Sequence, residues 1–193
     1  MRFMSIPPNS IRNKGQQQTG RQQSDRQQPG GQQAIIALGA NVDSPLGAPD
    51  VTVQAAAQDL RALGPVQLSS LLSTAPDNCP PGSPDFVNAV ALVQIEQPLA
   101  ALALLAELQS VERRYGRRRE PGLPVNAPRP LDLDLISYGE LRLESAALTL
   151  PHPRAHQRQF VLAPLAELAP DLILPGFTVS VQALLAALSE GAR

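Results

Sequence analysis

Short apolar runs that end at Gly or Pro alternate along the chain with longer stretches in which apolar residues recur at helical spacing. Short apolar or alternating runs are typical of strands, and a repeat of three to four residues is typical of helices. We predict strands over 34–38, 66–72, 86–95 and 131–138, and helices over 50–63 and 98–115. Gly64 and Gly116 follow the two predicted helices and are expected to end them.

The predicted order of elements is strand–helix–strand–strand–helix–strand. This order is typical of an α+β protein with a ferredoxin-like βαββαβ antiparallel sheet and its helices packed on one face. Beyond this unit the pattern predicts C-terminal additions, namely a strand pair within 141–150 and helices near 160–169 and 180–188. We therefore expect a single domain over 34–193.

The first 33 residues differ from the rest in composition. They hold nine glutamines and few large apolar residues, and their net charge is +4. Such a segment buries too little apolar surface to offset the entropy of ordering it, so residues 1–33 are predicted to be a disordered tail. The tail lacks the apolar stretch of a secretory signal, and we expect a cytoplasmic protein. Organelle targeting remains an alternative, because the tail has scattered Arg and one acidic residue.

Composition excludes several classes of site. The single cysteine, Cys79, excludes an internal disulfide and any multi-cysteine zinc or iron–sulfur site. The only lysine is Lys14, so the chain has no P-loop, and Schiff-base chemistry is not expected. No stretch of about 18 apolar residues exists that would span a membrane.

Two carboxylates lie two residues apart on the predicted strand 131–138. Asp132 and Asp134 therefore point to the same face, about 6.5–7 Å apart at Cα, while the leucines between them face the core. Carboxylates on a rigid strand suit Mg²⁺, which typically takes one or two of them together with substrate phosphates. Taken alone, this pair is more typical of a solvated strand face with two unrelated acids than of a metal site.

Arginines precede the pair and favour the metal-phosphate interpretation. Arg113, Arg114, Arg117, Arg118, Arg119 and Arg129 all lie within twenty residues of Asp132. Guanidinium groups neutralise phosphate oxygens through paired hydrogen bonds, as polyphosphate transfer requires. A basic helix end explains Arg113 or Arg114, but it does not explain Arg129 between two prolines.

Both histidines lie in the segment 151–160. The spacing of His152 and His156 fits zinc on a helix, but Pro151 and Pro153 disfavour a helix there. Contact of His152 and Arg158 with phosphate or nucleotide is the more natural interpretation.

Taken together, these stretches resemble the 6-hydroxymethyl-7,8-dihydropterin pyrophosphokinase family over about residues 34–176. The resemblance rests on four motifs in order and spacing. They are Arg129-Pro130-Leu131-Asp132-Leu133-Asp134-Leu135, Gly39-Ala40-Asn41, Asp85-Phe86-Val87-Asn88-Ala89, and Leu150-Pro151-His152 with Arg158 and Phe160. The chain departs from the family pattern at Ala40, Phe86 and Pro153.

The resemblance implies transfer of pyrophosphate from ATP to the hydroxymethyl group of the pterin, with AMP as the other product. It implies two Mg²⁺ held by Asp132 and Asp134, with Arg117 and Arg129 as catalytic phosphate contacts. The ATP site would be lined by Gln109, Glu112, Arg117, Arg119, Arg129, Leu135, Thr149, His152 and Arg158. The pterin pocket would be lined by Thr74, Phe86, Asn88 and Phe160, with the ring stacked between the two phenylalanines. The expected partners are these small molecules alone, with neither nucleic acid nor membrane, and the expected state is a monomer.

Three other classes of protein remain open at this point. An RNA-binding module requires aromatic residues on the sheet face, which the predicted strands lack, and residues 34–193 carry a net charge of −5. Another Mg²⁺-dependent phosphotransferase or nuclease would use the same two aspartates. A catalytically inactive relative is disfavoured because both aspartates and the arginines are retained.

Overall fold

The computed structural model describes residues 31–119, 122, 124 and 126–191 of the chain. The predicted tail 1–33 lies outside the described residues except at 31–33, and there the first strand begins earlier than predicted, at Gln32. Among the described residues, none of the helices combines the length and the apolar character that crossing a bilayer requires.

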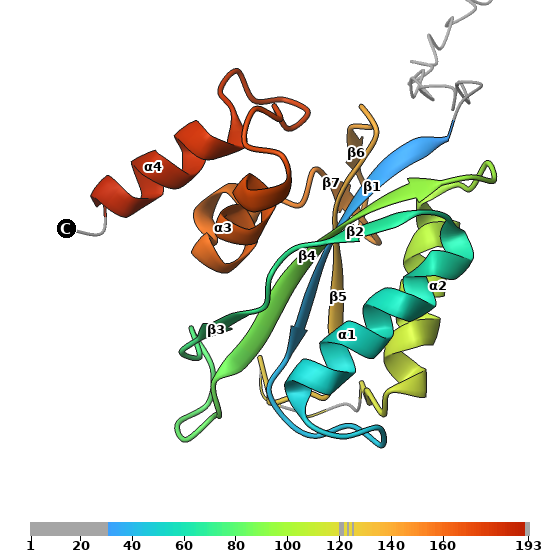
Figure 1. Cartoon of the computed structure of the whole chain (residues 1–193), viewed down its shortest axis with the longest axis vertical. Helices are drawn as coiled ribbons and strands as arrows, with labels where there is room; N and C mark the ends of the chain where they lie inside the picture. Colours follow the sequence, from blue (N-terminus) through green and yellow to red (C-terminus); the bar gives the residue numbers. More distant parts are fainter. Residues whose placement is uncertain (1–30, 120–121, 123, 125, 192–193) are drawn as a thin grey trace, which may run out of the picture.

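A five-stranded antiparallel sheet forms the centre of the fold (Figure 1). Its strands are β1 (Gln32–Ala40), β2 (Val66–Leu68), β3 (Leu72–Thr74), β4 (Phe86–Ile95) and β5 (Asp132–Tyr138). The strand order is β2-β4-β1-β5, and β3 pairs with a different part of β4 from the part that pairs with β2. The two central strands, β1 and β4, pair over nine residues, from Gln32 opposite Ile95 to Ala40 opposite Val87.

The helices cover both faces of the sheet (Figure 1). One pair is α1 (Pro49–Asp59), continued by the 3-10 turn η1 (Leu60–Leu63), and α2 (Ala101–Arg114); the other is α3 (Gln159–Leu168) and α4 (Val181–Gly191). Alternation along β1 explains the two cores, because successive side chains of a strand point to opposite faces. Ile36 and Leu38 pack in the α1/α2 core, and Ile35 and Ala37 pack in the α3/α4 core.

Short elements complete the C-terminal part. A two-stranded sheet pairs β6 (Leu143–Glu144) with β7 (Thr149–Leu150), and a 3-10 turn, η2 (Ala155–Gln157), precedes α3. Strands β6 and β7 lie within the predicted strand pair 141–150, and α3 and α4 lie near the helices predicted over 160–169 and 180–188.

Two predicted elements differ from the structure. The strand predicted over 66–72 is divided, because the Ser69 hydroxyl accepts the Val90 N–H at 3.0 Å and Ser70 turns away to donate its N–H to Glu167 at 3.0 Å. The helix predicted from Pro98 begins at Ala101. Neither difference moves the residues predicted to carry the chemistry.

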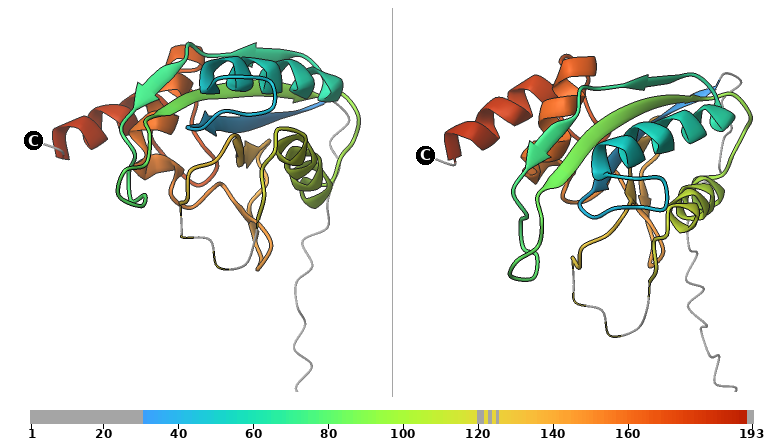
Figure 2. Two further views of the ribbon diagram at one scale, coloured as in Figure 1. Left: turned by 90° about the horizontal axis from the view of Figure 1, so that it is seen from below. Right: turned by 60° about the horizontal axis from the view of Figure 1, so that its bottom comes forward.

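The connections from β3 to β4 and from α2 to β5 reach the same end of the sheet (Figure 2). Asn126 in the second connection donates a hydrogen bond from Nδ2 to the carbonyl oxygen of Asn78 in the first, at 2.9 Å. Both asparagines have positive φ, 58° and 51°, a conformation that Asn tolerates better than most residues. Strand β5 begins at this same end, so the two connections border its first residues.

Candidate active site

Asp132 and Asp134 begin strand β5 and share one face of it, as the alternation predicts. Their side chains retain 19% and 38% of their surface exposed, whereas Leu131, Leu133 and Leu135 on the opposite face are at most 4% exposed. The buried leucines anchor the strand in the α1/α2 core. The two carboxylates are therefore held on a rigid support with their oxygens accessible.

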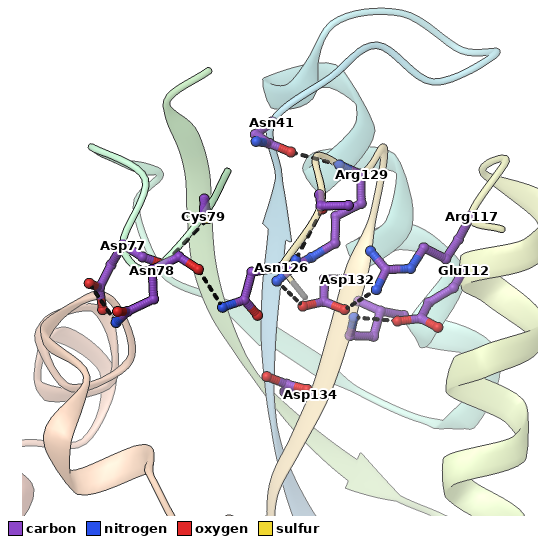
Figure 3. Close-up of polar contacts among 12 residues, drawn as sticks. Asn41, Asp77, Asn78, Cys79, Glu112, Arg117, Asn126, Arg129, Asp132 and Asp134 are labelled. Atoms are coloured by element: carbon purple, nitrogen blue, oxygen red, sulfur yellow. Dashed lines mark hydrogen bonds and ion pairs between the residues drawn. The ribbon is translucent and has the colours of Figure 1, made fainter. Parts of the chain in front are cut away.

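Three arginines converge on the two carboxylates, two from the connection between α2 and β5 and one from just before α3 (Figure 3 shows Arg117 and Arg129). Arg129 Nη2 lies 2.8 Å from Asp132 Oδ2, and Arg117 Nη2 lies 3.4 Å from Asp132 Oδ1. Arg158 Nη1 donates to Asp134 Oδ2 at 3.1 Å. These cations offset the repulsion between the carboxylates, and each is a donor of the kind that binds phosphate.

Arg117 and Arg129 retain unused hydrogen-bonding capacity. The Nε atom of each is buried and has no partner among the described residues. Burial also lowers the pKa of Arg117, with the Asp132 carboxylate acting in the opposite direction. A buried donor without an acceptor is costly, so these atoms point to an anionic ligand that would supply one.

The larger of two adjoining cavities has a volume of about 680 Å³. It is lined by described residues of the arginine-rich connection between α2 and β5, by both aspartates, and by His152, Arg154 and Arg158. Arg117, Arg119, Arg129, His152 and Arg158, all expected at an ATP site, therefore lie around one cavity.

Four residues expected at the ATP site are not among those that line the larger cavity. Gln109, Glu112, Leu135 and Thr149 are absent from the described lining of both cavities. Leu135 packs in the α1/α2 core, and Glu112 is 1% exposed beneath β5. Glu112 Oε1 accepts the Leu133 N–H at 3.0 Å, and its Oε2 accepts a bond from Arg119 Nη2 at 2.7 Å. Glu112 thus supports the site from behind and orients Arg119.

The smaller cavity, of about 90 Å³, holds the residues expected around a pterin. Thr74, Phe86, Asn88 and Phe160 all line it. Asn88 Nδ2 donates to Thr74 Oγ1 at 2.8 Å, which fixes the orientation of the amide. A Cβ at Gly39 would approach Asn88 Oδ1 to 3.1 Å, so the glycine leaves room for this amide.

The two cavities meet at the carboxylates. Both are lined by Asn126, Arg129, Asp132, Asp134, Arg154 and Arg158. Two of these cations also lie over the aromatic rings, with Arg129 Cζ 5.3 Å from the Phe86 centroid and Arg158 Cζ 5.4 Å from that of Phe160. The junction therefore combines carboxylates, cations and aromatic faces.

His152 lines the larger cavity. Burial, the largest influence, lowers its pKa, with Asp134 acting in the opposite direction. The Arg154 backbone N–H donates to His152 Nδ1 at 3.2 Å, so the hydrogen-bond arrangement assigns the ring proton to Nε2. His152 is thus a candidate donor through Nε2.

The side chains of Asp132 and Asp134 supply only part of the coordination that Mg²⁺ requires. Among the described residues there is no cluster of three or more His, Cys, Asp or Glu side chains that would enclose a metal. Asp132 and Asp134 supply hard oxygen donors, and Mg²⁺ commonly completes its coordination with water and substrate phosphates. The residues therefore fit a metal that arrives with a phosphate ligand.

Asn41 was part of a recognised motif but was not expected at the site. It is 2% exposed, its Oδ1 accepts the Arg129 N–H at 2.8 Å, and its own N–H donates to the Arg129 carbonyl at 3.1 Å. Its Nδ2 donates to the Pro84 carbonyl at 3.2 Å. Asn41 thus ties the end of β1 to both connections that border the site, and Figure 3 shows its contact with Arg129. Its place directly after Gly39-Ala40 was the only sequence signal.

Comparison with known proteins agrees with this arrangement. The family model for 7,8-dihydro-6-hydroxymethylpterin-pyrophosphokinase (HPPK) matches residues 35–170. The 2-amino-4-hydroxy-6-hydroxymethyldihydropteridine pyrophosphokinase of Haemophilus influenzae is 42% identical over 142 residues, which cover 74% of this chain and 84% of that protein. The mitochondrial folate synthesis bifunctional protein of Arabidopsis thaliana is 42% identical over 100 residues, which cover 52% of this chain and 17% of that protein.

A solved structure described as HPPK-DHPS in complex with substrates superposes with a TM-score of 0.65 and 12% identity. The match covers 84% of this chain and 44% of that chain, and at this identity it shows a shared fold alone. The match over residues 35–170 and the bacterial relative show more than the fold. The chain belongs to the 7,8-dihydro-6-hydroxymethylpterin-pyrophosphokinase family.

Proposed function

We propose that the junction of the two cavities is where this chain transfers a pyrophosphoryl group. As a member of its family, the chain is an ATP-dependent diphosphotransferase of folate biosynthesis. It moves pyrophosphate from ATP to the hydroxymethyl group of 6-hydroxymethyl-7,8-dihydropterin and gives AMP and the pterin diphosphate. The observation that carries the placement is that Asp132 and Asp134 line both cavities.

The larger cavity would hold ATP. Its volume of about 680 Å³ lies within the range of small-molecule sites, and cations dominate its charged lining. Arg117 and Arg129 would direct their unpartnered Nε atoms at phosphate oxygens, and His152 would donate from Nε2. Arg158, now paired with Asp134, would complete the phosphate contacts.

The smaller cavity would hold the pterin. A flat ring between Phe86 and Phe160 gains stacking area on both faces, and Asn88 would hydrogen-bond its edge. This position directs the hydroxymethyl group toward the carboxylates and the bound phosphates. No side chain is assigned as general base, because positioning and charge neutralisation supply most of the rate in phosphoryl transfer.

Asp132 and Asp134 would hold two Mg²⁺ that arrive with ATP. Bound there, the ions would neutralise phosphate charge. The arginines now paired with the carboxylates would then be available to the phosphates, because a metal replaces them as the positive partner of Asp132 and Asp134.

The test is to incubate the protein with ATP, Mg²⁺ and 6-hydroxymethyl-7,8-dihydropterin and to measure AMP. We expect AMP that depends on the pterin, and its loss in Asp132→Ala. Asp171→Ala serves as the control, because Asp171 is exposed and lines neither cavity. ADP as product would identify an ordinary kinase instead. A folded protein that releases no nucleotide product would identify an inactive relative.

The remaining expectations belong to the same proposal. A ferredoxin-like βαββαβ sheet within a single domain over 34–193 is supported by the order β2-β4-β1-β5, by antiparallel pairing throughout, and by α1 and α2 on one face. The elements after β5 are the C-terminal additions to it. We also propose a cytoplasmic monomer, which light scattering and cell fractionation would test.

A further inference from the structure

Arg154 differs from the other arginines around the two cavities. It stands just before the turn η2, and its side chain is exposed. Arg117, Arg129 and Arg158 each lie within ion-pair distance of Asp132 or Asp134. Among the described residues, no carboxylate lies within ion-pair distance of the Arg154 guanidinium, and no hydrogen bond of that group is present.

The position of Arg154 places its charge at the junction. It lines the larger cavity and the smaller one, a property that it shares with Arg129 and Arg158 among the cations. The transferred diphosphate is the only part of the two substrates that passes from one cavity to the other. A group that lines both cavities is therefore placed to contact the diphosphate before and after transfer.

The backbone around Arg154 is held by hydrogen bonds. Its N–H donates to His152 Nδ1, its carbonyl accepts the Gln157 N–H at 3.1 Å, and the Ala155 N–H donates to the His152 carbonyl at 3.1 Å. These bonds fix the backbone from which the Arg154 side chain extends, and they leave the guanidinium able to move. None of them involves the side chain, so a substitution at residue 154 retains all three.

Electrostatics favours Arg154 as an anion contact that needs no rearrangement. Arg129 and Arg158 must share or leave a carboxylate before they donate fully to phosphate. A cation without an ion pair gives up only its hydration when it binds an anion, and guanidinium groups are weakly hydrated. Arg154 therefore offers a charge at the junction before any ion pair opens.

We propose that Arg154 binds the diphosphate group during and after its transfer and so contributes to recognition of the pterin diphosphate product. This inference rests on the proposed function. The ligand group that Arg154 would bind is the diphosphate ester, and Arg154 is not assigned a contact with the pterin ring or the adenosine. The effect is expected in the affinity for phosphorylated ligands.

The test compares Arg154→Gln and Arg154→Lys with Arg61→Gln, a control at an exposed arginine on η1 that lines neither cavity. Calorimetry measures the dissociation constants of inorganic pyrophosphate, the pterin diphosphate and 6-hydroxymethylpterin, with Mg²⁺ present. We expect Arg154→Gln to weaken the two phosphorylated ligands about tenfold, in line with one charge-assisted contact. The unphosphorylated pterin should bind unchanged, and Arg154→Lys should recover part of the loss.

Two results would overturn the proposal. One is unchanged affinity for both phosphorylated ligands in Arg154→Gln. The other is an equal loss for 6-hydroxymethylpterin, which would mean that the side chain only supports the pocket. A wild-type chain that releases no AMP would refute the proposed function, whereas active wild type with an unaffected variant refutes the Arg154 inference alone.

Discussion

Glu112 is the deepest charged side chain near the site, and its removal provides a sharp test of how the site is supported. It lies on α2 with 1% of its surface exposed, and its Oε1 accepts the N–H of Leu133, the residue between the two aspartates. Glu112→Ala deletes this acceptor and leaves the Leu133 N–H buried without a partner. Glu112→Gln retains a carbonyl oxygen for the Leu133 N–H, but it removes the charge and replaces the oxygen that accepts from Arg119 with an NH2 group.

The expected change in the free energy of unfolding follows from the two contacts of the Glu112 carboxylate. An unsatisfied buried N–H costs about 1–3 kcal/mol. The pair with Arg119 contributes about 0–1 kcal/mol, because the Arg119 side chain is 58% exposed. With the packing lost on truncation, we expect Glu112→Ala to lower the free energy of unfolding by about 2–4 kcal/mol. For Glu112→Gln we expect about 1 kcal/mol.

Urea denaturation followed by circular dichroism measures these differences. Glu107→Ala is the matched control, since Glu107 lies on the same helix and is exposed. The control should change the midpoint little. Equal losses in Glu112→Ala and Glu112→Gln would refute the reasoning, because the charge and not the acceptor would then carry the stability. A loss below about 0.5 kcal/mol in Glu112→Ala would refute it as well, since a buried orphaned donor costs more than this.

Three further predictions concern the site. Burial lowers the His152 pKa below its unfolded value of 6.5, so the unfolded state takes up the proton first as pH falls. The free energy of unfolding of the ligand-free protein should therefore decline below about pH 6.5, and it should decline less steeply in His152→Gln. Urea denaturation at about pH 5–7.5 measures both. Asp132 and Asp134 are both paired with arginines, so Mg²⁺ alone should bind there too weakly for calorimetry to detect. Binding of Mg²⁺ should become measurable with a non-hydrolysable ATP analogue, and tight binding of Mg²⁺ alone would contradict this. Asn41→Ala leaves the Arg129 N–H and the Pro84 carbonyl without partners, so it should lower the free energy of unfolding in urea by about 2 kcal/mol and also lower kcat. Asn41→Asp keeps the acceptor for the Arg129 N–H, so it should retain more activity than Asn41→Ala.

The long central strands were predictable because their signal is local. The apolar run over 86–95 coincides with β4, and the alternation after Pro130 coincides with β5 to within one residue. The division of 66–72 was not predictable, because it depends on Glu167, which lies 97 residues away from Ser70 and accepts its N–H. A strand break caused by a distant side chain leaves no pattern in its own segment.

The same distinction separates the parts of the site. The shared face of Asp132 and Asp134 follows from the period of a strand, and the structure shows it. Glu112 was expected to line the ATP site, but helix periodicity alone does not say whether a carboxylate faces a cavity or the underside of a neighbouring strand. Asn41 matters because of contacts made across the fold, and Arg154 because it lines both cavities. A single sequence encodes neither feature in any short spacing.

The arginines at the junction connect the two cavities physically. Arg129 contacts Asp132 through Nη2 and lies over the Phe86 ring, and Arg158 contacts Asp134 and lies over the Phe160 ring. Each guanidinium is thus shared between a carboxylate and an aromatic wall. A cation or phosphate that changes the carboxylate contact also changes how the guanidinium lies on the ring, because one planar group makes both contacts. We therefore expect occupation of the larger cavity to alter the walls of the smaller one through these two side chains, with no movement of the sheet required.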